Sequence, residues 1–339
     1  MKRSNHRGRT SCIKVLLFSI PRLIACCTSA TTVAVLLQLP AFVTSCARAQ
    51  LTDHSRKGQQ IYIQWTKNPS QALLDCFYFD TEPPENLDSY QQIPISGNGT
   101  VAGVSTLGPR RLVVLSQNGS GDWYGIRTYA DLCKLRFSLA DEDPDRPQML
   151  GEAVLGEALS QPCSLSLRPA LTRIGLRSIS ADFRRYPYAG EPFVCTGVYL
   201  AYAVTECLPL AIGKARPAPL SWLNAGEPDS TQVLRLPHPE MLLQEGFGTV
   251  GPARRTLSLD FYCYPGPQLR LVLAGKVGED LCYYPVPLGN LQAGQSYELD
   301  LTLTRKGAPS ADLPVQSGTV LVESASIPWE WKDVLEIEL

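Results

Sequence analysis

Cys46 is the residue of this chain whose surroundings point most clearly to a chemical reaction. It ends the run Val43-Thr44-Ser45-Cys46 within an uncharged stretch, 23–47, and several Lys and Arg residues precede that stretch. Small residues before a cysteine, behind an apolar segment with a basic front, are typical of a bacterial export signal that is cut before the cysteine. The thiol of that cysteine is then lipidated. We therefore predict a signal peptide at 1–45, a lipid on Cys46 and a surface-tethered protein.

Two other interpretations of this segment stay open. One is an uncleaved N-terminal anchor helix, and the other is a plain secretory signal cut at a different position. The apolar core is short and is diluted by threonine, serine and Pro40, which suits a removable signal better than a permanent span. Stable attachment through lipid needs at least two acyl chains, at about 0.8 kcal/mol for each buried methylene, and a multiply acylated cysteine meets that need.

Few residues behind the signal offer catalytic or metal-binding chemistry. Only His54 and His238 remain there, and no Ser/His/Asp or Cys/His arrangement can be assembled from them. The cysteines after Cys46 show no CxxC spacing, and the histidines are too few for a zinc site. We expect no catalysis, no cofactor and no metal.

The cysteines have a simpler interpretation. Most lie in strand-like runs, where a cysteine usually serves as a small buried apolar residue. One disulfide, between Cys263 and Cys282, is compatible with the sequence but not required, so the disulfide state stays open.

Short apolar and aromatic runs separated by turn residues predict an all-β protein. The sequence has 27 Pro and 26 Gly but only 3 Met, which favours a sandwich of short strands over a helical bundle. A formal net charge of −1 gives no reason to expect nucleic acid or an anionic membrane as a partner. The mature chain has the length of two domains with a junction near 160–162, so we predict domains at 46–159 and 160–339.

Alternating apolar residues place the expected strands. In 61–65, Ile61, Ile63 and Trp65 share one face, and in 297–304 leucines alternate with polar residues as in a half-buried antiparallel strand. The other expected strands are 73–79, 111–115, 165–176, 193–204, 257–264, 269–274, 281–286 and 320–327.

A single helix is expected in the front half. Thr128 can cap it, Asp131 supports its first turn, and Leu132, Leu135 and Leu139 share a face. The proline-rich segment 215–239 is expected to be irregular, with Trp222 as a packing anchor.

Several segments recur, in the same order, in one known family, and the match covers nearly the whole mature chain. They are Leu74–Asp80, Leu87–Tyr90, Met149–Glu152, Tyr186–Gly190, Val198–Leu200, Phe261–Pro265, Arg270–Leu273, Tyr283–Val286, Tyr297–Gly307 and Ile327–Trp329. By this order the chain resembles the fimbrillin family.

The resemblance implies a fold and a role. The fold is all-β, with two tandem transthyretin-like antiparallel β-sandwich domains and one short helix in the N-terminal domain. The role is that of a structural subunit of type V pili, which reaches the outer membrane as a lipoprotein and supports adhesion. Its partners would be other fimbrial subunits, the outer membrane, and host or bacterial surface ligands. In polymerising members an Arg-specific protease removes the first strand, and a strand of another subunit fills the groove.

The resemblance also gives candidate residues. Arg48 and Arg56 are candidate cleavage points, although a solvated tether charge is the alternative for Arg56. A cut at either arginine would release the lipid but leave the first strand, which departs from the polymerising pattern, so stalk, anchor and tip roles stay open. The candidate strand-exchange faces are Ile61, Ile63 and Trp65 at the front and Leu335, Ile337 and Leu339 at the end.

Three alternatives accompany these interpretations. The segment 335–339 can instead be an ordinary final strand in its own sheet. The whole chain can instead be a surface glycan-binding lipoprotein of a nutrient-uptake system, which would bind sugars through Trp123, Trp222 and Trp331 unless these pack in the core. A lipid-anchored hydrolase is disfavoured by the shortage of histidines.

Overall fold

The computed structural model divides the chain into two compact units, Met1–Arg56 and Lys57–Leu339. All described residues belong to the second unit. They are 61–65, 73–94, 109–116, 123–156, 163–210, 218–224, 228, 230–289 and 291–328.

Several predicted site residues lie outside these ranges and stay predictions. They are Cys46, Arg48, Arg56, Trp331, Leu335, Ile337 and Leu339.

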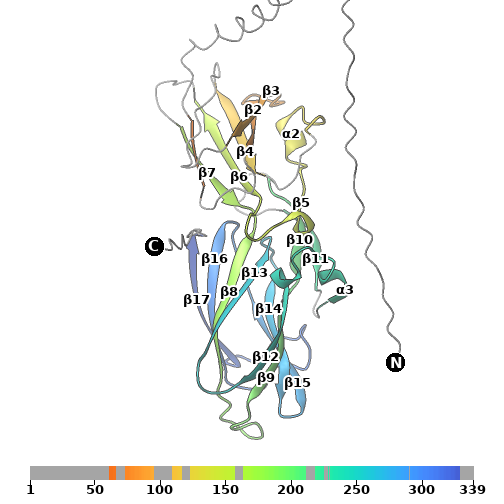
Figure 1. Cartoon of the computed structure of the whole chain (residues 1–339), viewed down its shortest axis with the longest axis vertical. Helices are drawn as coiled ribbons and strands as arrows, with labels where there is room; N and C mark the ends of the chain where they lie inside the picture. Colours follow the sequence, from red (N-terminus) through yellow and green to blue (C-terminus); the bar gives the residue numbers. More distant parts are fainter. Residues whose placement is uncertain are drawn as a thin grey trace, which may run out of the picture. The chain divides into compact units, whose positions relative to one another are not determined.

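The described residues form an all-β fold of open sheets, as predicted. The first sheet has the strand order β1-β7-β6-β4-β2-β3 (Figure 1), and every neighbouring pair is antiparallel except β1 and β7, which are parallel. Its strands are β1 (Ile61–Trp65), β2 (Leu73–Asp80), β3 (Leu87–Pro94), β4 (Arg110–Ser116), β6 (Met149–Leu155) and β7 (Cys163–Pro169).

Both faces of this sheet are covered, which explains the continuous apolar runs of β2 and β4. Phe77 and Phe79 of β2 pack on one face, and Leu74, Cys76 and Tyr78 belong to a separate cluster on the other. Because alternate side chains of a strand point to opposite faces, the apolar residues of β2 are divided between two cores.

The predicted helix forms, but it is shorter than expected. In α2 (Tyr129–Leu132), the Asp131 amide donates to the Thr128 hydroxyl, 3.2 Å away, and the Thr128 amide donates to the Asp131 carboxylate at 3.1 Å. Hydrogen bonds from Lys134 and Thr128 lower the pKa of Asp131 to about 2. The helix ends at Leu132, so Leu139 lies beyond β5 (Phe137–Ser138), in the 3-10 turn η1 (Leu139–Asp141).

The second half is a sandwich of two four-stranded sheets (Figure 1). One has the order β13-β8-β16-β17, in which β8 and β16 are parallel, and the other has the order β12-β9-β14-β15. Their strands are β8 (Thr172–Ala181), β9 (Phe193–Ala201), β12 (Leu243–Val250), β13 (Arg255–Cys263), β14 (Arg270–Val277), β15 (Asp280–Pro287), β16 (Gln295–Leu303) and β17 (Val320–Pro328). The short helix α3 (Ser230–Val233) and the 3-10 turn η2 (Pro239–Met241) precede β12.

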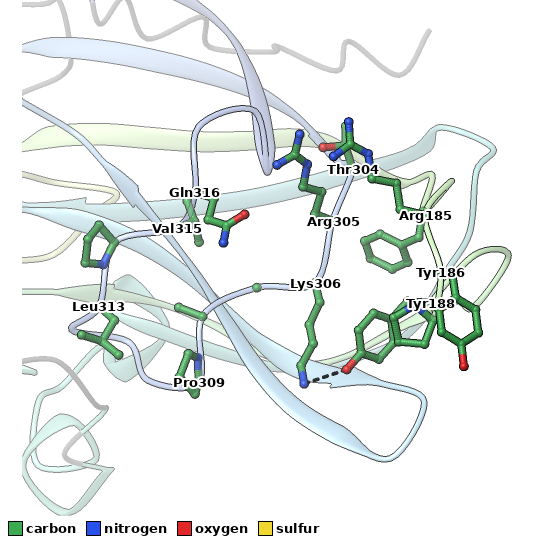
Figure 2. A pocket seen from close by; sticks show the side chains of 15 residues that line it. Arg185, Tyr186, Tyr188, Thr304, Arg305, Lys306, Pro309, Leu313, Val315 and Gln316 are labelled. Carbon is green, nitrogen blue, oxygen red and sulfur yellow. Dashed lines mark hydrogen bonds between the residues drawn. The ribbon is translucent and has the colours of Figure 1, made fainter.

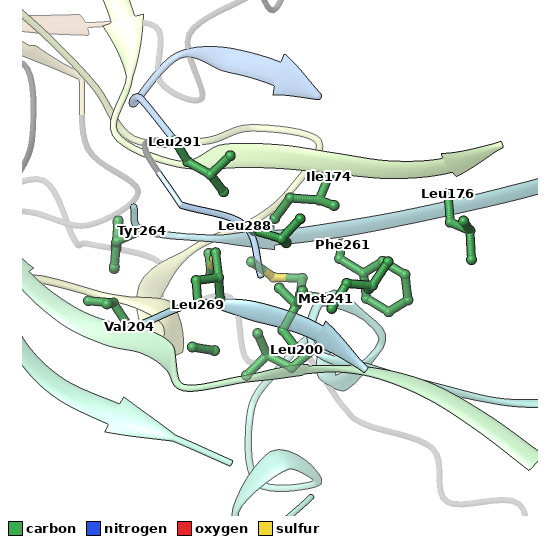
Figure 3. Packing of buried hydrophobic residues seen from close by; sticks show 14 of the residues in the cluster. Ile174, Leu176, Leu200, Val204, Met241, Phe261, Tyr264, Leu269, Leu288 and Leu291 are labelled. Carbon is green, nitrogen blue, oxygen red and sulfur yellow. The ribbon is translucent and has the colours of Figure 1, made fainter. Parts of the chain in front are cut away.

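One core lies between these sheets (Figure 3). In β16, Leu299, Leu301 and Leu303 are buried while the residues between them are only half-buried, which confirms the predicted alternation. Burying one such side chain contributes about 1.5–3 kcal/mol. Other members of the core include Ile174, Leu176, Leu200, Phe261 and Leu271.

A small third sheet, β11-β10-β5, joins the two halves of the chain. In it, Phe137 of β5 pairs with Cys207 of β10 (Ala203–Leu208). Nearby, the buried Tyr264 hydroxyl donates to Glu142 at 2.9 Å. Burial, reinforced by Glu142, raises the pKa of Tyr264 well above its usual range. The predicted boundary after residue 159 stays a prediction, but β7, which follows it, pairs within the first sheet.

Two strand expectations are wrong. The expected strand 165–176 is two strands, because the chain leaves the first sheet after Pro169 and enters the second at Thr172. The expected strand 193–204 breaks at Tyr202, whose φ of 52° is a left-handed conformation that a strand cannot continue.

The segment 215–239 is not wholly irregular. It contains β11 (Ala218–Leu223), which pairs with β10 at the edge of the small sheet. Trp222 is 49% exposed and is not a packing anchor, because the buried position beside it is taken by Leu223.

The seven cysteines within the described ranges are all unpaired. Burial raises the pKa of the Cys76 and Cys195 thiols to about 12, as expected for cysteines that act as apolar residues. Cys263 and Cys282 are both buried but lie in different sheets, on β13 and β15. None of the helices in the described ranges has the length and apolar composition that a membrane span requires.

Substitution of Gly275 tests how closely β14 packs against β9. A Cβ at this buried position would lie 2.2 Å from the Val194 carbonyl oxygen, so we expect Gly275→Ala to lower the free energy of unfolding by about 1–3 kcal/mol. At Gly251 nothing lies within 4 Å of a Cβ, so Gly251→Ala is the matched control and should leave stability unchanged or slightly raised. Urea denaturation measures both, and equal effects of the two substitutions would contradict the packing described.

Candidate functional site

The edges of the open sheets are the features of this fold that can join it to another chain. An edge strand presents a row of backbone N–H and C=O groups that can pair with a further strand, and proteins usually protect such edges. The edge strands of the larger sheets are β1 and β3, β12 and β15, and β13 and β17.

Four of these edges carry protection. Register shifts interrupt the pairing of β12 and of β13 with their neighbours, as β-bulges do. Part of the β15 edge is covered, because the Tyr283 amide donates to Ala308 at 2.8 Å and Tyr283 accepts a bond in return. The start of β3 is covered in a similar way by the Leu87 amide, which donates to Arg127 at 2.8 Å.

Within the residues that the structure describes, the β17 edge has none of these devices. It pairs with β16 in an uninterrupted register from Val320↔Leu303 to Pro328↔Gln295. Glu323 is its only charged residue. Its apolar side chains reach solvent, with Leu321 53%, Val322 44% and Ile327 48% exposed. An unbulged edge of this kind, with a single charged residue, is a template for β-strand addition.

The β1 edge is also unprotected by charge or bulge. Its five residues pair in parallel with β7, from Ile61↔Cys163 to Trp65↔Leu167. Ile63 is 2% exposed and belongs to the same cluster as Leu165 and Leu167. Loss of β1 would uncover the backbone of β7 together with this apolar cluster, which is the geometry of an acceptor groove.

The outer face of the sheet β13-β8-β16-β17 carries a network of compensated charges. Arg177 donates to Asp260 at 2.6 Å and pairs with Glu298, while Arg173 contacts Asp260 at 3.0 Å. Bonds from Ser178 and Arg254 lower the pKa of Asp300 on the same face. Because these charges satisfy one another, this face offers less to a ligand than the edges do.

Among the described residues, those considered for sugar binding or catalysis are not in contact with one another. Trp123 packs edge-on against Phe77, with ring centroids 5.0 Å apart, as the core interpretation expects. Trp222 is half exposed on β11, and His238 lies 3.1 Å from Glu240. In the ranges that the structure describes, no group of three His, Cys, Asp or Glu residues is placed to hold a metal ion.

Comparison with known proteins gives a match in structure only. No protein-family model matches this sequence, and no curated protein matches it. A "putative cell adhesion protein" from Parabacteroides distasonis matches with a TM-score of 0.58 and 13% identity, over 76% of this chain and 88% of that one. A fimbrilin (FimA) from Porphyromonas gingivalis matches with a TM-score of 0.54 and 12% identity, over 81% and 99%.

This chain has the fimbrillin fold. A third protein, a "putative cell adhesion protein" from Bacteroides eggerthii, matches with a TM-score of 0.52 and 15% identity, over 80% of this chain and 97% of that one. The fold predicted from the order of short sequence segments is therefore confirmed, and the fimbrillin fold extends across both halves of the described chain.

Sequence reasoning recognised β17 as a strand but not as an edge. The signal was present in the run Val320–Pro328, which has one charged residue and no glycine. What the sequence does not show is which strand lies beside it, and therefore which side of it stays open.

Introducing a charged side chain into β17 tests whether this edge pairs with another copy of the chain. We expect Val322→Lys to reduce self-association at high concentration, because a lysine on an edge disfavours strand addition. Its free energy of unfolding should change by about 1 kcal/mol or less, since Val322 is 44% exposed. Sedimentation velocity measures the association, with Thr249→Lys on the interrupted β12 edge as the control. Unchanged association of Val322→Lys, or an equal loss in Thr249→Lys, would count against the β17 edge.

Proposed function

We propose that this protein is a structural subunit of surface fimbriae of the type V pilus class, exported as a lipoprotein on Cys46 and joined to other subunits by β-strand addition. The observation that carries the proposal is the pair of unprotected edges, β17 and β1, on a fimbrillin fold. The β17 edge presents backbone groups beside exposed apolar side chains, and a strand from another subunit satisfies both together. The role is structural and extracellular, and it involves no catalysis.

The positions of the arginines refine this role. No arginine lies between Arg56 and Arg110, so an Arg-specific cut in the tether leaves β1 attached. A retained β1 keeps the first sheet complete and its groove closed, because Ile63 stays buried beside β7. Such a subunit can give a strand from its C-terminal region but does not receive one in that groove, which favours a place at one end of a fimbria.

Assembly in fimbriated cells tests the proposal. Cells that export fimbriae and an Arg-specific protease should carry this protein in SDS-resistant species of high mass, and its N-terminal peptide should still contain β1. A variant truncated after Pro328 removes the predicted donor residues Leu335, Ile337 and Leu339, and should remain monomeric. The double substitution Arg48→Lys/Arg56→Lys separates the effect of cleavage from that of the donor segment. A full-length protein that stays monomeric with its leader intact would contradict the proposal.

A further inference from the structure

Two loops of the C-terminal sandwich line an open pocket of about 640 Å³ (Figure 2). One loop, 183–188, follows β8, and the other segments, 304–309 and 313–316, lie between β16 and β17. We call this the loop pocket. Its volume lies within the range typical of small-molecule sites, about 300–1,000 Å³.

The loop pocket is basic. Its lining includes Arg185, Arg305 and Lys306 but no aspartate or glutamate. Lys306 is paired with Asp280 at 2.7 Å, just outside the lining. Arg185 and the half-buried Arg305 have no side-chain hydrogen bond or ion pair with any residue that the structure describes. Two uncompensated guanidinium groups in one pocket select for an anionic ligand.

The loop pocket also presents aromatic surface. Tyr186 is 94% exposed, so packing within the chain does not account for it. Tyr188 is held in place, because its hydroxyl donates to Asp280 at 2.5 Å and accepts from Lys306 at 3.0 Å (Figure 2). A tyrosine combines a broad apolar face with a polar tip, which suits a ligand that has both apolar and hydroxyl surface.

The loop that carries Arg185 and Tyr186 is held in one conformation by hydrogen bonds between its own backbone groups. The Tyr188 amide donates to the Arg185 carbonyl at 3.1 Å, and the Gly190 amide donates to the Phe183 carbonyl at 2.9 Å. Gly190 has a φ of 79°, a conformation that favours glycine. A preformed site loses less conformational entropy when it binds a ligand.

On the other side of the loop pocket, several backbone groups already make hydrogen bonds within the chain. The Thr304 amide donates to Thr319 at 2.9 Å, and Ala308 exchanges two bonds of 2.8 Å with Tyr283. An extended peptide that binds by strand addition needs free backbone groups, so it has little to pair with here. Recognition must come from side chains, which favours a compact ring over a peptide.

We propose that the loop pocket binds a carboxylated sugar, such as a sialic or uronic acid residue of an acidic glycan. The guanidinium groups of Arg185 and Arg305 pair with the carboxylate, and the face of Tyr186 packs on the sugar ring. Gln316 also lines the loop pocket, at the end away from Tyr186 (Figure 2). This site lies on a single chain and does not depend on how subunits join, so it can fail or hold independently of the proposed assembly.

Titration of the monomeric full chain tests the loop pocket. The probes are 3′-sialyllactose and trigalacturonate, with lactose as the neutral sugar, and calorimetry or ligand-observed NMR gives the affinity. We expect saturable binding of at least one acidic sugar and none of lactose. Arg305→Ala and Arg185→Ala should each weaken that binding by about tenfold or more, since each removes a charge-assisted contact. Tyr186→Ala should weaken it as well.

Two matched controls are available. Arg235 is an exposed arginine outside the pocket, and Tyr124 is 94% exposed, as Tyr186 is. Arg235→Ala and Tyr124→Ala should leave the affinity unchanged, and the thermal midpoint of every variant shows whether it is folded. The proposal is overturned if neither acidic sugar saturates, if lactose binds equally, if folded Arg185→Ala/Arg305→Ala retains the affinity, or if a glutamate-rich peptide binds more tightly at the same residues.

Discussion

Every open sheet ends in strands whose outward N–H and C=O groups have no partner within the sheet. In the described part of this chain, some edge strands are protected against further pairing and others are not. Interrupted registers modify β12 and β13, while short backbone bridges cover parts of β3 and β15. The β17 and β1 edges keep regular pairing, and Glu323 is the only charged residue in these two strands. This contrast within one molecule is what supports the proposed role in assembly.

The buried cores stabilise the fold, so the edge strands can remain unpaired on their outer side. Leucines of β16 are buried in the sandwich, so β17 rests on a strand that is fixed from the other side. The bridge from Tyr264 to Glu142 and the pairing of β5 with β10 join the two halves through buried contacts. A strand that pairs at an edge would therefore attach to a single compact unit, as the proposed role in a fimbria requires. The loop pocket differs from these edges in chemistry, since side chains form it and several of its backbone groups are already paired.

Local patterns in the sequence were sufficient for much of the fold. The cap at Thr128 and the leucine alternation of β16 depend on neighbours in sequence, and both form as predicted. The change of sheet after Pro169 and the break at Tyr202 depend on distant partners, so alternation alone missed them. The loop pocket was missed for the same reason, because Arg185 and Arg305 meet only when β8 and β16 pair. The predicted lipid and cleavage sites lie outside the described residues and stay predictions.

Hydrogen exchange measured by mass spectrometry on the free and the assembled protein tests most directly whether an open edge is the joint. If it is, peptides that cover 320–328 gain protection on assembly, because their outward amides acquire a partner strand, while the central strands β8 and β9 exchange equally in both states. Equal exchange of 320–328 in the free and assembled protein would contradict the account, since the β17 edge would then remain unpaired in the fimbria.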